Sequence, residues 1–283
     1  MAPATFHLIC LSRPMEPEVL ASKLSGLNLH SQPIWVGKVH HWLLEPRLSA
    51  DALTGTGNIT TKWDYLLVGP RDIPEPLRLE IASSWSITAN IADDAQRPEI
   101  FSDQLLASAP SLPSGWSSED PSNFEESRSL DDLKLSLATK SRLLGSHKNV
   151  DGVTVKDFAR DFGSSHQGPV VVLNLLSYAP GQRLAYLEGY VSGFGRTVGP
   201  RYGSAAICFA PGVSSWSSRA EENCQGLHAS WEDVALVWYP SIWHFVKMLD
   251  DPDYARLDRE FKTGLLEDNP LLCCTEVKTV QGG

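Results

Sequence analysis

The stretch Trp231–Tyr254 carries, in order, the signals of a buried strand, a turn and an amphipathic helix. Residues 234–238 are a short apolar run rich in β-branched and aromatic side chains, which is typical of a buried strand. Pro240 lacks a backbone N–H and ends the strand, and Ser241 is suited to cap the following helix. That helix has one apolar face, formed by Ile242, Phe245, Val246 and Leu249. The unit constrains the fold far more than it constrains a reaction.

The same order of elements can be read twice along the chain. The first copy predicts strands at residues 6–11, 33–44, 63–68 and 86–91, with helices at 16–24 and 74–83. The second predicts strands at 169–176, 203–210, 234–238 and 271–278, with helices at 184–198 and 242–265, the last broken by Pro252. Trp63–Pro70 echoes Trp231–Pro240, which favours a duplication. The sequence therefore predicts an α+β fold of tandem ferredoxin-like βαββαβ units.

The predicted units divide the chain into an N-terminal half at residues 1–91, a joining segment at 92–168 and a C-terminal half at 169–283. The joining segment is rich in Ser, Pro and Asp and reads as a surface loop with partial helices. Residues 129–142 and 154–162 have helical spacing, with Thr154 as an N-cap and Asp157 three residues later. A lid over the barrel and a plain tether both fit this composition.

The composition of the chain limits the classes of molecule that it can bind. The chain has 283 residues and 42% hydrophobic residues, enough to bury a large core. Its net charge of −10 argues against nucleic acids and anionic membranes as partners. No apolar run approaches the length of a membrane span, and the N-terminus has no cationic signal region, so a cytoplasmic protein is expected. The five cysteines show no metal-binding spacing and are expected to be reduced core thiols.

Four short motifs in the C-terminal half carry a family resemblance: the pair Tyr186 and Tyr190, then Arg201-Tyr202-Gly203, Tyr239-Pro240-Ser241 and Asp251-Pro252-Asp253-Tyr254. Through them, residues 169–277 resemble the dimeric α+β-barrel superfamily, and within it the small domain called DUF1330. The whole chain is similar to a fungal group with a degenerate N-terminal copy, in which Trp63-Asp64 and Trp85-Ser86-Ile87-Thr88-Ala89 recur.

The resemblance implies an intramolecular, pseudo-dimeric α+β barrel. The two halves would close within one chain the barrel that single-domain relatives make by dimerising, so a monomer or weak homodimer is expected. Such barrels have a pocket between the concave face of the sheet and its helices. The superfamily includes cofactor-free oxygenases, polyketide cyclases, decarboxylases, dehalogenases and heme enzymes, so the fold alone does not fix the chemistry.

The sequence has no phosphate-binding loop, nucleophile elbow or zinc-binding histidine pair, and we expect neither metal nor cofactor. His244 lies one turn into the second helix, where an imidazole could act as a general acid or base, or be a hydrogen-bonded, half-buried side chain. Asn174 interrupts an apolar strand and needs either a backbone partner or a pocket. The hydroxyl of Tyr190 could bind a substrate carbonyl, or lie at the rim of a packed core.

The other candidate residues are proposed to contact a substrate. Arg196 could bind a carboxylate or complement a helix end. The aromatic candidates could line a cavity, although core packing explains them as well; they are Tyr186, Tyr239 and Trp243 in the C-terminal half, and His41, Trp35 and Trp63 in the N-terminal half.

The leading hypothesis is a cofactor-independent cyclase or isomerase that acts on a hydrophobic polyketide or terpenoid intermediate of fungal secondary metabolism. Diels–Alder-type pericyclic closure is one such reaction. Shape complementarity and a hydrogen bond to a carbonyl would supply the catalysis, with His244, Tyr190 and Asn174 as the polar groups. The alternatives are a cofactor-free oxygenase or decarboxylase with His244 as the base, and a non-catalytic small-molecule-binding or stress-response module.

Overall fold

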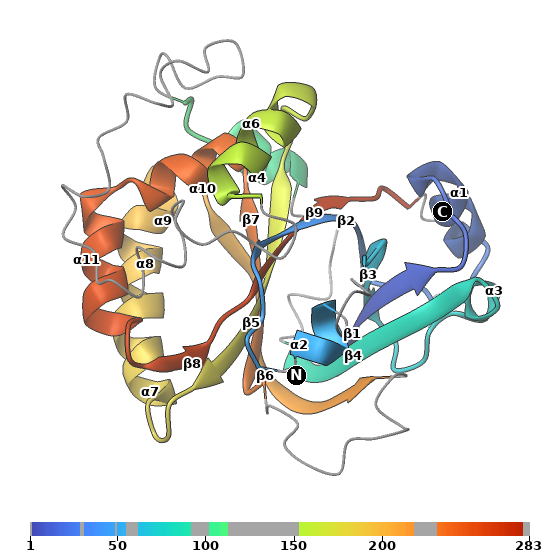
Figure 1. Ribbon diagram of the computed structural model, residues 1–283. Helices are drawn as coiled ribbons and strands as arrows, with labels where there is room; N and C mark the ends of the chain where they lie inside the picture. Colours follow the sequence, from blue (N-terminus) through green and yellow to red (C-terminus); the bar gives the residue numbers. More distant parts are fainter. Residues whose placement is uncertain are drawn as a thin grey trace.

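The chain folds around one curled antiparallel sheet, seen in the computed structural model of Figure 1. The structure describes residues 2–28, 31–48, 50–54, 62–91, 102–112, 153–217 and 231–279. The N-terminal strands are β1 (Ala2–Leu11), β2 (Trp35–Leu44), β3 (Tyr65–Gly69) and β4 (Ile81–Ile91). The C-terminal strands are β5 (Val170–Tyr178), β6 (Ala205–Ser217), β7 (Asp233–Tyr239), the short β8 (Leu266–Asp268) and β9 (Leu271–Glu276).

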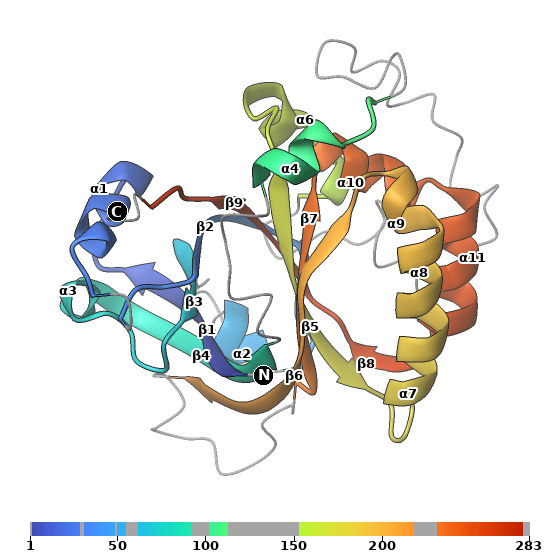
Figure 2. The ribbon, with the colours of Figure 1, turned by 180° about the vertical axis from the view of Figure 1, so that it is seen from behind.

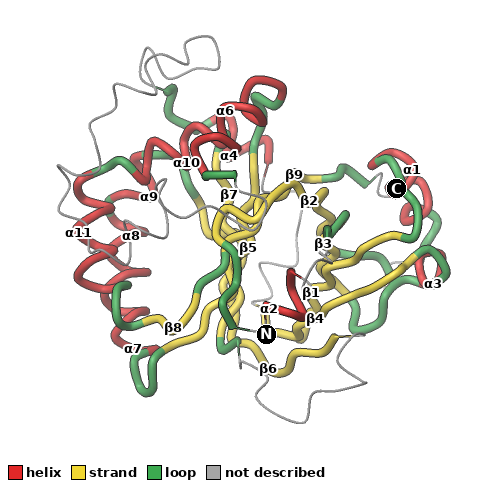
Figure 3. Tube along the Cα trace, in the orientation of Figure 1, coloured by secondary structure: helices red, strands yellow, loops and turns green. Residues whose placement is uncertain are grey.

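The helices flank this sheet, and Figure 3 shows α8, α9 and α11 along one side of β5–β7. The N-terminal helices are α1 (Pro17–Ser25), α2 (Ala50–Thr54) and α3 (Glu75–Arg78). The middle of the chain contributes α4 (Ser102–Ala107) and α6 (Val155–Ser165). The C-terminal helices are α7 (Arg183–Tyr186), the π-helical turn η5 (Leu187–Val191), α8 (Ser192–Arg196), α9 (Val198–Arg201), α10 (Ile242–Leu249) and α11 (Pro252–Phe261).

Eight of the strands form a closed circuit. The strand order is β7-β6-β4-β1-β3-β2-β9-β5, and β5 pairs again with β7. Within the N-terminal set the order is fourth, first, third, second, and the C-terminal strands β9-β5-β7-β6 repeat it. The two sets meet at two seams, where Val39 of β2 is opposite Cys274 of β9 and Trp85 of β4 is opposite Ser217 of β6. We call this closed circuit the barrel.

Because successive side chains of a strand point to opposite faces of the sheet, the buried side chains form one inner core and two outer cores. The inner core fills the barrel and includes six tryptophans: Trp35, Trp42, Trp63, Trp85, Trp231 and Trp238. One outer core lies between β5, β7, β9 and helices α6, α10 and α11. The other lies between the N-terminal strands and helix α1. Val171 and Trp238 thus face the barrel interior, whereas Val170, Val172 and Tyr239 face the helices.

Local sequence signals place most of these elements correctly. Helix α10 begins at Ile242 as predicted, and Pro252 starts a new helix where a break was predicted, although that helix ends at Phe261 instead of residue 265. Thr154 caps α6 by accepting the backbone N–H of Asp157 at 3.1 Å, as the capping signal predicts. The predicted helix at 129–142 lies outside the described residues.

Several boundaries differ from the prediction because strand pairing decides them. The predicted helix 74–83 ends at Arg78, since Ile81 already pairs with Leu11 of β1. Strand β6 runs to Ser217 instead of residue 210, because its second part pairs with β4. Helix α2 lies between the predicted strands at 33–44 and 63–68, where no helix was predicted, and the short strand β8 was not predicted either.

Candidate functional site

Two helices bring four side chains together on the outer face of the C-terminal strands. Tyr186 and Tyr190 are one helical turn apart and stack with ring centroids 5.1 Å apart. Tyr254 of α11 meets Tyr190 edge to face at 6.5 Å. Asp258 is one turn further along α11 and therefore lies on the same helix face as Tyr254. We call these four residues the tyrosine–Asp258 cluster.

The helix that carries the two stacked tyrosines is locally unusual. Residues Leu187–Val191 form a π-helical turn, a feature found frequently at functional sites. Glycine permits α11 to approach this turn closely, because a Cβ at Gly189 would lie 2.3 Å from Cδ1 of Phe261. A Cβ at Gly193 would likewise lie 2.6 Å from Cδ2 of Leu257. The cluster is thus built where two helices pack at close range.

Asp258 is a buried carboxylate whose surroundings are largely apolar. Its residue exposure is 2%, and its Oδ2 has no hydrogen-bond partner among the described residues. It shares the inner face of α11 with Tyr254, Leu257 and Phe261, which follow helical spacing. Burying a carboxylate oxygen without a donor is costly, and such a group needs an explanation.

Three other aspartates with a residue exposure of 5% or less, Asp233, Asp251 and Asp268, have hydrogen-bond donors. Asp233 receives two hydrogen bonds from Arg183, at 2.9 and 3.0 Å, and one from the Tyr178 hydroxyl at 2.7 Å. Asp268 accepts the backbone N–H groups of Arg47 and Leu48 at 2.7 and 2.9 Å. These two carboxylates hold neighbouring segments together, which explains why they are buried.

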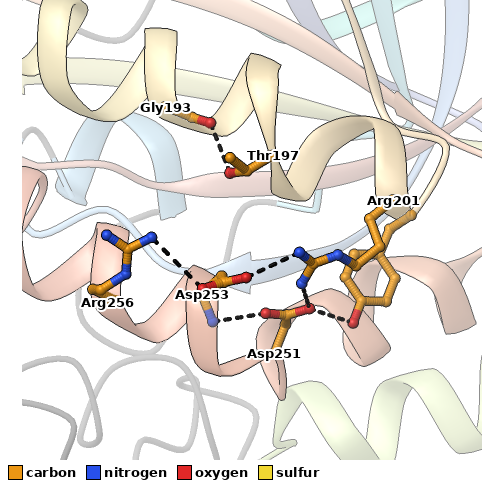
Figure 4. Close-up of polar contacts among 7 residues, drawn as sticks. Gly193, Thr197, Arg201, Asp251, Asp253 and Arg256 are labelled. Carbon is orange, nitrogen blue, oxygen red and sulfur yellow. Dashed lines mark hydrogen bonds and ion pairs between the residues drawn. The ribbon is translucent and has the colours of Figure 1, made fainter.

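Asp251 is the third such carboxylate, and Figure 4 shows its network. Arg201 donates to Asp251 at 2.6 Å and to Asp253 at 2.9 Å, and the Tyr202 hydroxyl donates to Asp251 at 2.7 Å. Asp251 also caps α11 by accepting the backbone N–H of Asp253. Burial would raise the pKa of Asp251, but these hydrogen bonds hold it below its ordinary value. Two of the motifs that carry the family resemblance therefore join α9 to α11.

Burial and charge keep the tyrosines of the cluster protonated. Burial is the main cause that raises the pKa values of Tyr186, Tyr190 and Tyr254 above their ordinary range. The nearby charge of Asp258 raises all three further. A protonated phenol is a hydrogen-bond donor, so the cluster offers donors beside one carboxylate acceptor. This combination can bind a carbonyl oxygen and remove a proton next to it.

The structure gathers some of the sequence-predicted residues near this cluster. Tyr186 and Tyr190 belong to it, and Tyr239 is close enough to raise the pKa values of both. Asn174 shares the outer face of β5 with Leu176 and Tyr178 and is half-buried. Its amide donates to the backbone oxygen of Val172 at 3.0 Å, which was one of the two expected arrangements.

His244 lies elsewhere, under the segment that follows α4. Its Nε2 is 2.9 Å from the backbone oxygen of Pro110, and its Nδ1 is 2.8 Å from the Ser241 hydroxyl. Because a carbonyl oxygen only accepts, Nε2 carries the proton and Nδ1 accepts from Ser241. Burial lowers the pKa of His244. Ser241 occupies the predicted N-cap position, but its hydroxyl contacts His244 instead of capping the backbone.

The remaining candidates are spread over the molecule. Trp243 is buried against Gly163 of α6, and Arg196 is exposed and bonds to Ser192. His41 stacks on Phe158 of α6 with centroids 4.7 Å apart. Trp35 and Trp63 lie inside the barrel, where the Trp63 indole donates to the Leu53 backbone at 2.6 Å. The structure thus does not bring the ten candidates into one site.

Sequence reasoning missed Asp258, although a signal was present. The residues Tyr254, Leu257 and Phe261 predict an apolar helix face, and Asp258 is the acid within it. Within the described ranges, no group of three or more His, Cys, Asp and Glu side chains is placed to hold a metal ion. In the same part of the chain, none of the helices combines the length and apolar character needed to cross a membrane.

No family model matches the sequence, and no curated protein matches it. A solved protein of unknown function from Rhodopseudomonas palustris matches with 24% identity over 43% of this chain and 92% of its own, at a TM-score of 0.32. Its methylated form matches with 22% identity over 48% and 98%, at 0.34. An anthrone oxidase-like protein matches over 99% and 96% with 8% identity, at 0.41. Likenesses this distant assign neither an activity nor a ligand to this chain.

Proposed function

We propose that this chain is a cofactor-independent isomerase or cyclase that moves a proton on a small hydrophobic carbonyl compound at the tyrosine–Asp258 cluster. The observation that carries the proposal is the buried carboxylate of Asp258, whose Oδ2 has no donor among the described residues. A buried polar atom without a partner calls for an explanation, and a functional role is the explanation that we propose for Asp258. The aromatic surroundings favour an apolar substrate, and a polyketide or terpenoid intermediate of fungal secondary metabolism is the class we propose.

In this mechanism Asp258 is the base and a tyrosine of the cluster is the hydrogen-bond donor. Asp258 takes the proton as the C–H bond beside the carbonyl breaks, and the electron pair moves into an enolate. The hydroxyl of Tyr190 or Tyr254 donates to the enolate oxygen, which gains charge in the transition state. Return of the proton to another carbon gives isomerisation. Attack of the enolate carbon on a second carbonyl gives ring closure, and the alkoxide formed from that carbonyl takes the proton back from Asp258. A carboxylate base beside a phenolic donor is an established arrangement for enolisation.

We propose that this site belongs to a tandem ferredoxin-like barrel of the dimeric α+β-barrel superfamily, with residues 92–168 joining the halves. The fourth-first-third-second strand order of each set and the closure of the barrel within one chain support this proposal. The cluster then lies in the C-terminal unit, between its sheet and its helices.

The test is exchange of the α-protons of 2-tetralone, an apolar ketone, followed by NMR in deuterium oxide. The wild type is expected to accelerate the exchange. Asp258→Asn should reduce the acceleration by about 10²-fold or more, since general-base catalysis is typically of this size. Tyr190→Phe should reduce it by about 10²-fold if its hydroxyl holds the enolate. Glu260→Gln, which removes an exposed charge from the same helix, is the matched control.

Other outcomes distinguish the remaining hypotheses. His244→Gln tests the role predicted for His244, and a loss in this variant together with a wild-type rate in Asp258→Asn would assign the base function to His244. Exchange in Asp258→Asn at the wild-type rate would overturn the proposed mechanism. Saturable binding of 2-tetralone without any acceleration would favour the non-catalytic binding module.

A further inference from the structure

Lys262 places a positive charge over the ring of Tyr190, one of the two hydroxyl donors in the proposed mechanism. The lysine follows the last residue of α11, the helix that Figure 2 shows beside α8. Its Nζ lies 5.3 Å from the centroid of the Tyr190 ring, within the range in which a cation and an aromatic face attract each other. The lysine is half-buried, so solvent screens its charge less than that of an exposed side chain. The proposed mechanism gives this charge no role.

The backbone fixes the point from which the Lys262 side chain starts. The N–H groups of Lys262 and Thr263 both donate to the backbone oxygen of Asp258, at 3.1 and 2.7 Å. The backbone oxygen of Lys262 in turn accepts the N–H of Leu265 at 3.2 Å. Within this turn Gly264 has a φ of +84°, a conformation that glycine adopts without a steric penalty. Lys262 is therefore held one helical turn beyond Asp258, next to the tyrosine–Asp258 cluster.

A cation over a phenol ring makes the hydroxyl a stronger hydrogen-bond donor, because a nearby positive charge favours negative charge on the phenolic oxygen. Burial, followed by neighbouring groups that include Asp258, raises the pKa of Tyr190 well above its ordinary value. The charge of Lys262 opposes this effect without reversing it. The Tyr190 hydroxyl thus stays protonated at pH 7, and Lys262 increases the strength of the hydrogen bond that it donates.

Tyr254, the other candidate donor, has a different relation to this charge. Burial is the main cause that raises the pKa of Tyr254, and hydrogen bonding by the Tyr190 hydroxyl lowers it. The two hydroxyls are therefore close together, but the contact with Lys262 is made by the ring of Tyr190. Of the two donors, Tyr190 is the one whose strength depends directly on the lysine.

From this geometry we propose that Lys262 strengthens the hydrogen bond from Tyr190 to the enolate oxygen, and that Tyr190 is thereby the donor of the reaction in preference to Tyr254. The inference rests on the proposed function, because it concerns the enolate formed there. Lys262 acts through Tyr190 and is a positioning residue. Since the oxygen gains its negative charge only on the way to the transition state, the lysine should affect kcat more than KM.

The first test is the exchange of the α-protons of 2-tetralone. Lys262→Met and Lys262→Gln should each lower kcat about tenfold and change KM less than about twofold, since one half-buried charge acts on a single hydrogen bond. Lys262→Arg keeps the charge and should retain most of the activity. Arg259→Met, which removes an exposed charge from the same helix, is the matched control. Urea unfolding of each variant shows that it folds.

Double variants show whether the lysine acts through Tyr190. Lys262→Met should cause no further loss in a Tyr190→Phe protein, whereas its full effect should persist in a Tyr254→Phe protein. An equal loss in the wild type and in Tyr190→Phe would overturn the proposal.

The second test needs no catalysis. The anion of 4-nitrophenol resembles an enolate in charge, and its visible absorption reports the ratio of anion to neutral phenol in the bound state. We choose Asp258→Asn as the background, because its amide stands for the acid that has taken the proton. Adding Lys262→Met should lower the bound ratio about tenfold, and adding Arg259→Met should leave it unchanged.

The two tests separate this inference from the proposed function. A ratio that depends on Lys262, in a protein whose wild type does not accelerate exchange, would refute the proposed reaction and support the role of Lys262. Absence of 4-nitrophenol binding, or a ratio that Lys262→Met leaves unchanged, would overturn the role of Lys262 whatever the rate of exchange.

Discussion

At the level of single residues, Asp258 differs from the three other aspartates with an exposure of 5% or less, because its buried Oδ2 has no hydrogen-bond partner among the described residues. Asp233, Asp251 and Asp268 are also buried, and each is held by arginine, tyrosine or backbone donors. These three carboxylates each join two segments of the chain. A buried carboxylate oxygen without a donor lowers the free energy of unfolding. Residues that destabilise the fold in this way are characteristic of functional sites.

Removing the charge of Asp258 should therefore stabilise the fold. Asp258→Asn is expected to raise the free energy of unfolding by about 1–2 kcal/mol at pH 7, because the amide avoids the penalty of a buried charge. Glu260→Gln, on the exposed side of α11, should change it by less than about 0.5 kcal/mol. Urea unfolding followed by tryptophan fluorescence measures both. A loss of stability in Asp258→Asn would mean that the carboxylate makes stabilising contacts.

Sequence predicts contacts between residues only when they are close along the chain. Tyr186 and Tyr190 are four residues apart, so helical spacing alone makes them neighbours. Helical spacing in the sequence likewise places Asp258 within the apolar face of α11. The contact of His244 with Pro110 spans 134 residues. No local pattern predicts such a contact, because it depends on how α4 and α10 come together.

At the level of elements, the approach of α11 to the π-helical turn explains two of the glycines. A Cβ at Gly189 would overlap the ring of Phe261, whereas a Cβ at Gly195 would meet nothing within 4 Å. The two glycines thus differ in their packing surroundings. The π turn itself could not be predicted, because a local shift to i+5 hydrogen bonding leaves the apolar spacing of the helix nearly unchanged.

This difference predicts opposite effects of the same substitution. Gly189→Ala should lower the free energy of unfolding by about 1–3 kcal/mol, as overpacking does. Gly195→Ala should raise it by up to about 1 kcal/mol, because alanine is the better helix former. Thermal and urea unfolding of the two variants, side by side, measures the contrast. Equal effects would show that α11 does not depend on close contact at Gly189.

At the level of the whole molecule, the two sets of strands meet at their seams and through Asp268. The backbone N–H groups of Arg47 and Leu48, which follow β2, are held by this carboxylate of β8. The sequence predicts the order of the strands, because each has a local apolar pattern. It does not predict the seams, since neither the second part of β6 nor the pairing of β2 with β9 has a local signal.

Loss of the Asp268 carboxylate should weaken this connection. Asp268→Ala leaves three backbone donors without their acceptor, those of Arg47, Leu48 and Asn269. We expect a loss of about 2–4 kcal/mol in the free energy of unfolding, and faster hydrogen exchange at the Arg47 and Leu48 amides. Glu267→Ala, which removes the neighbouring exposed acid, is the control. Unchanged exchange at these amides would contradict the role given to Asp268.

The closed circuit of strands also bears on how copies of the chain meet in a concentrated solution. Each of the eight barrel strands has a neighbour on both sides, so none is an edge strand. Edge strands are the templates on which a second chain adds its own strand during aggregation or domain swapping. The remaining strand, β8, is three residues long and carries two acids. Within the described part of the chain, the sheet therefore offers no long edge for a second copy to extend.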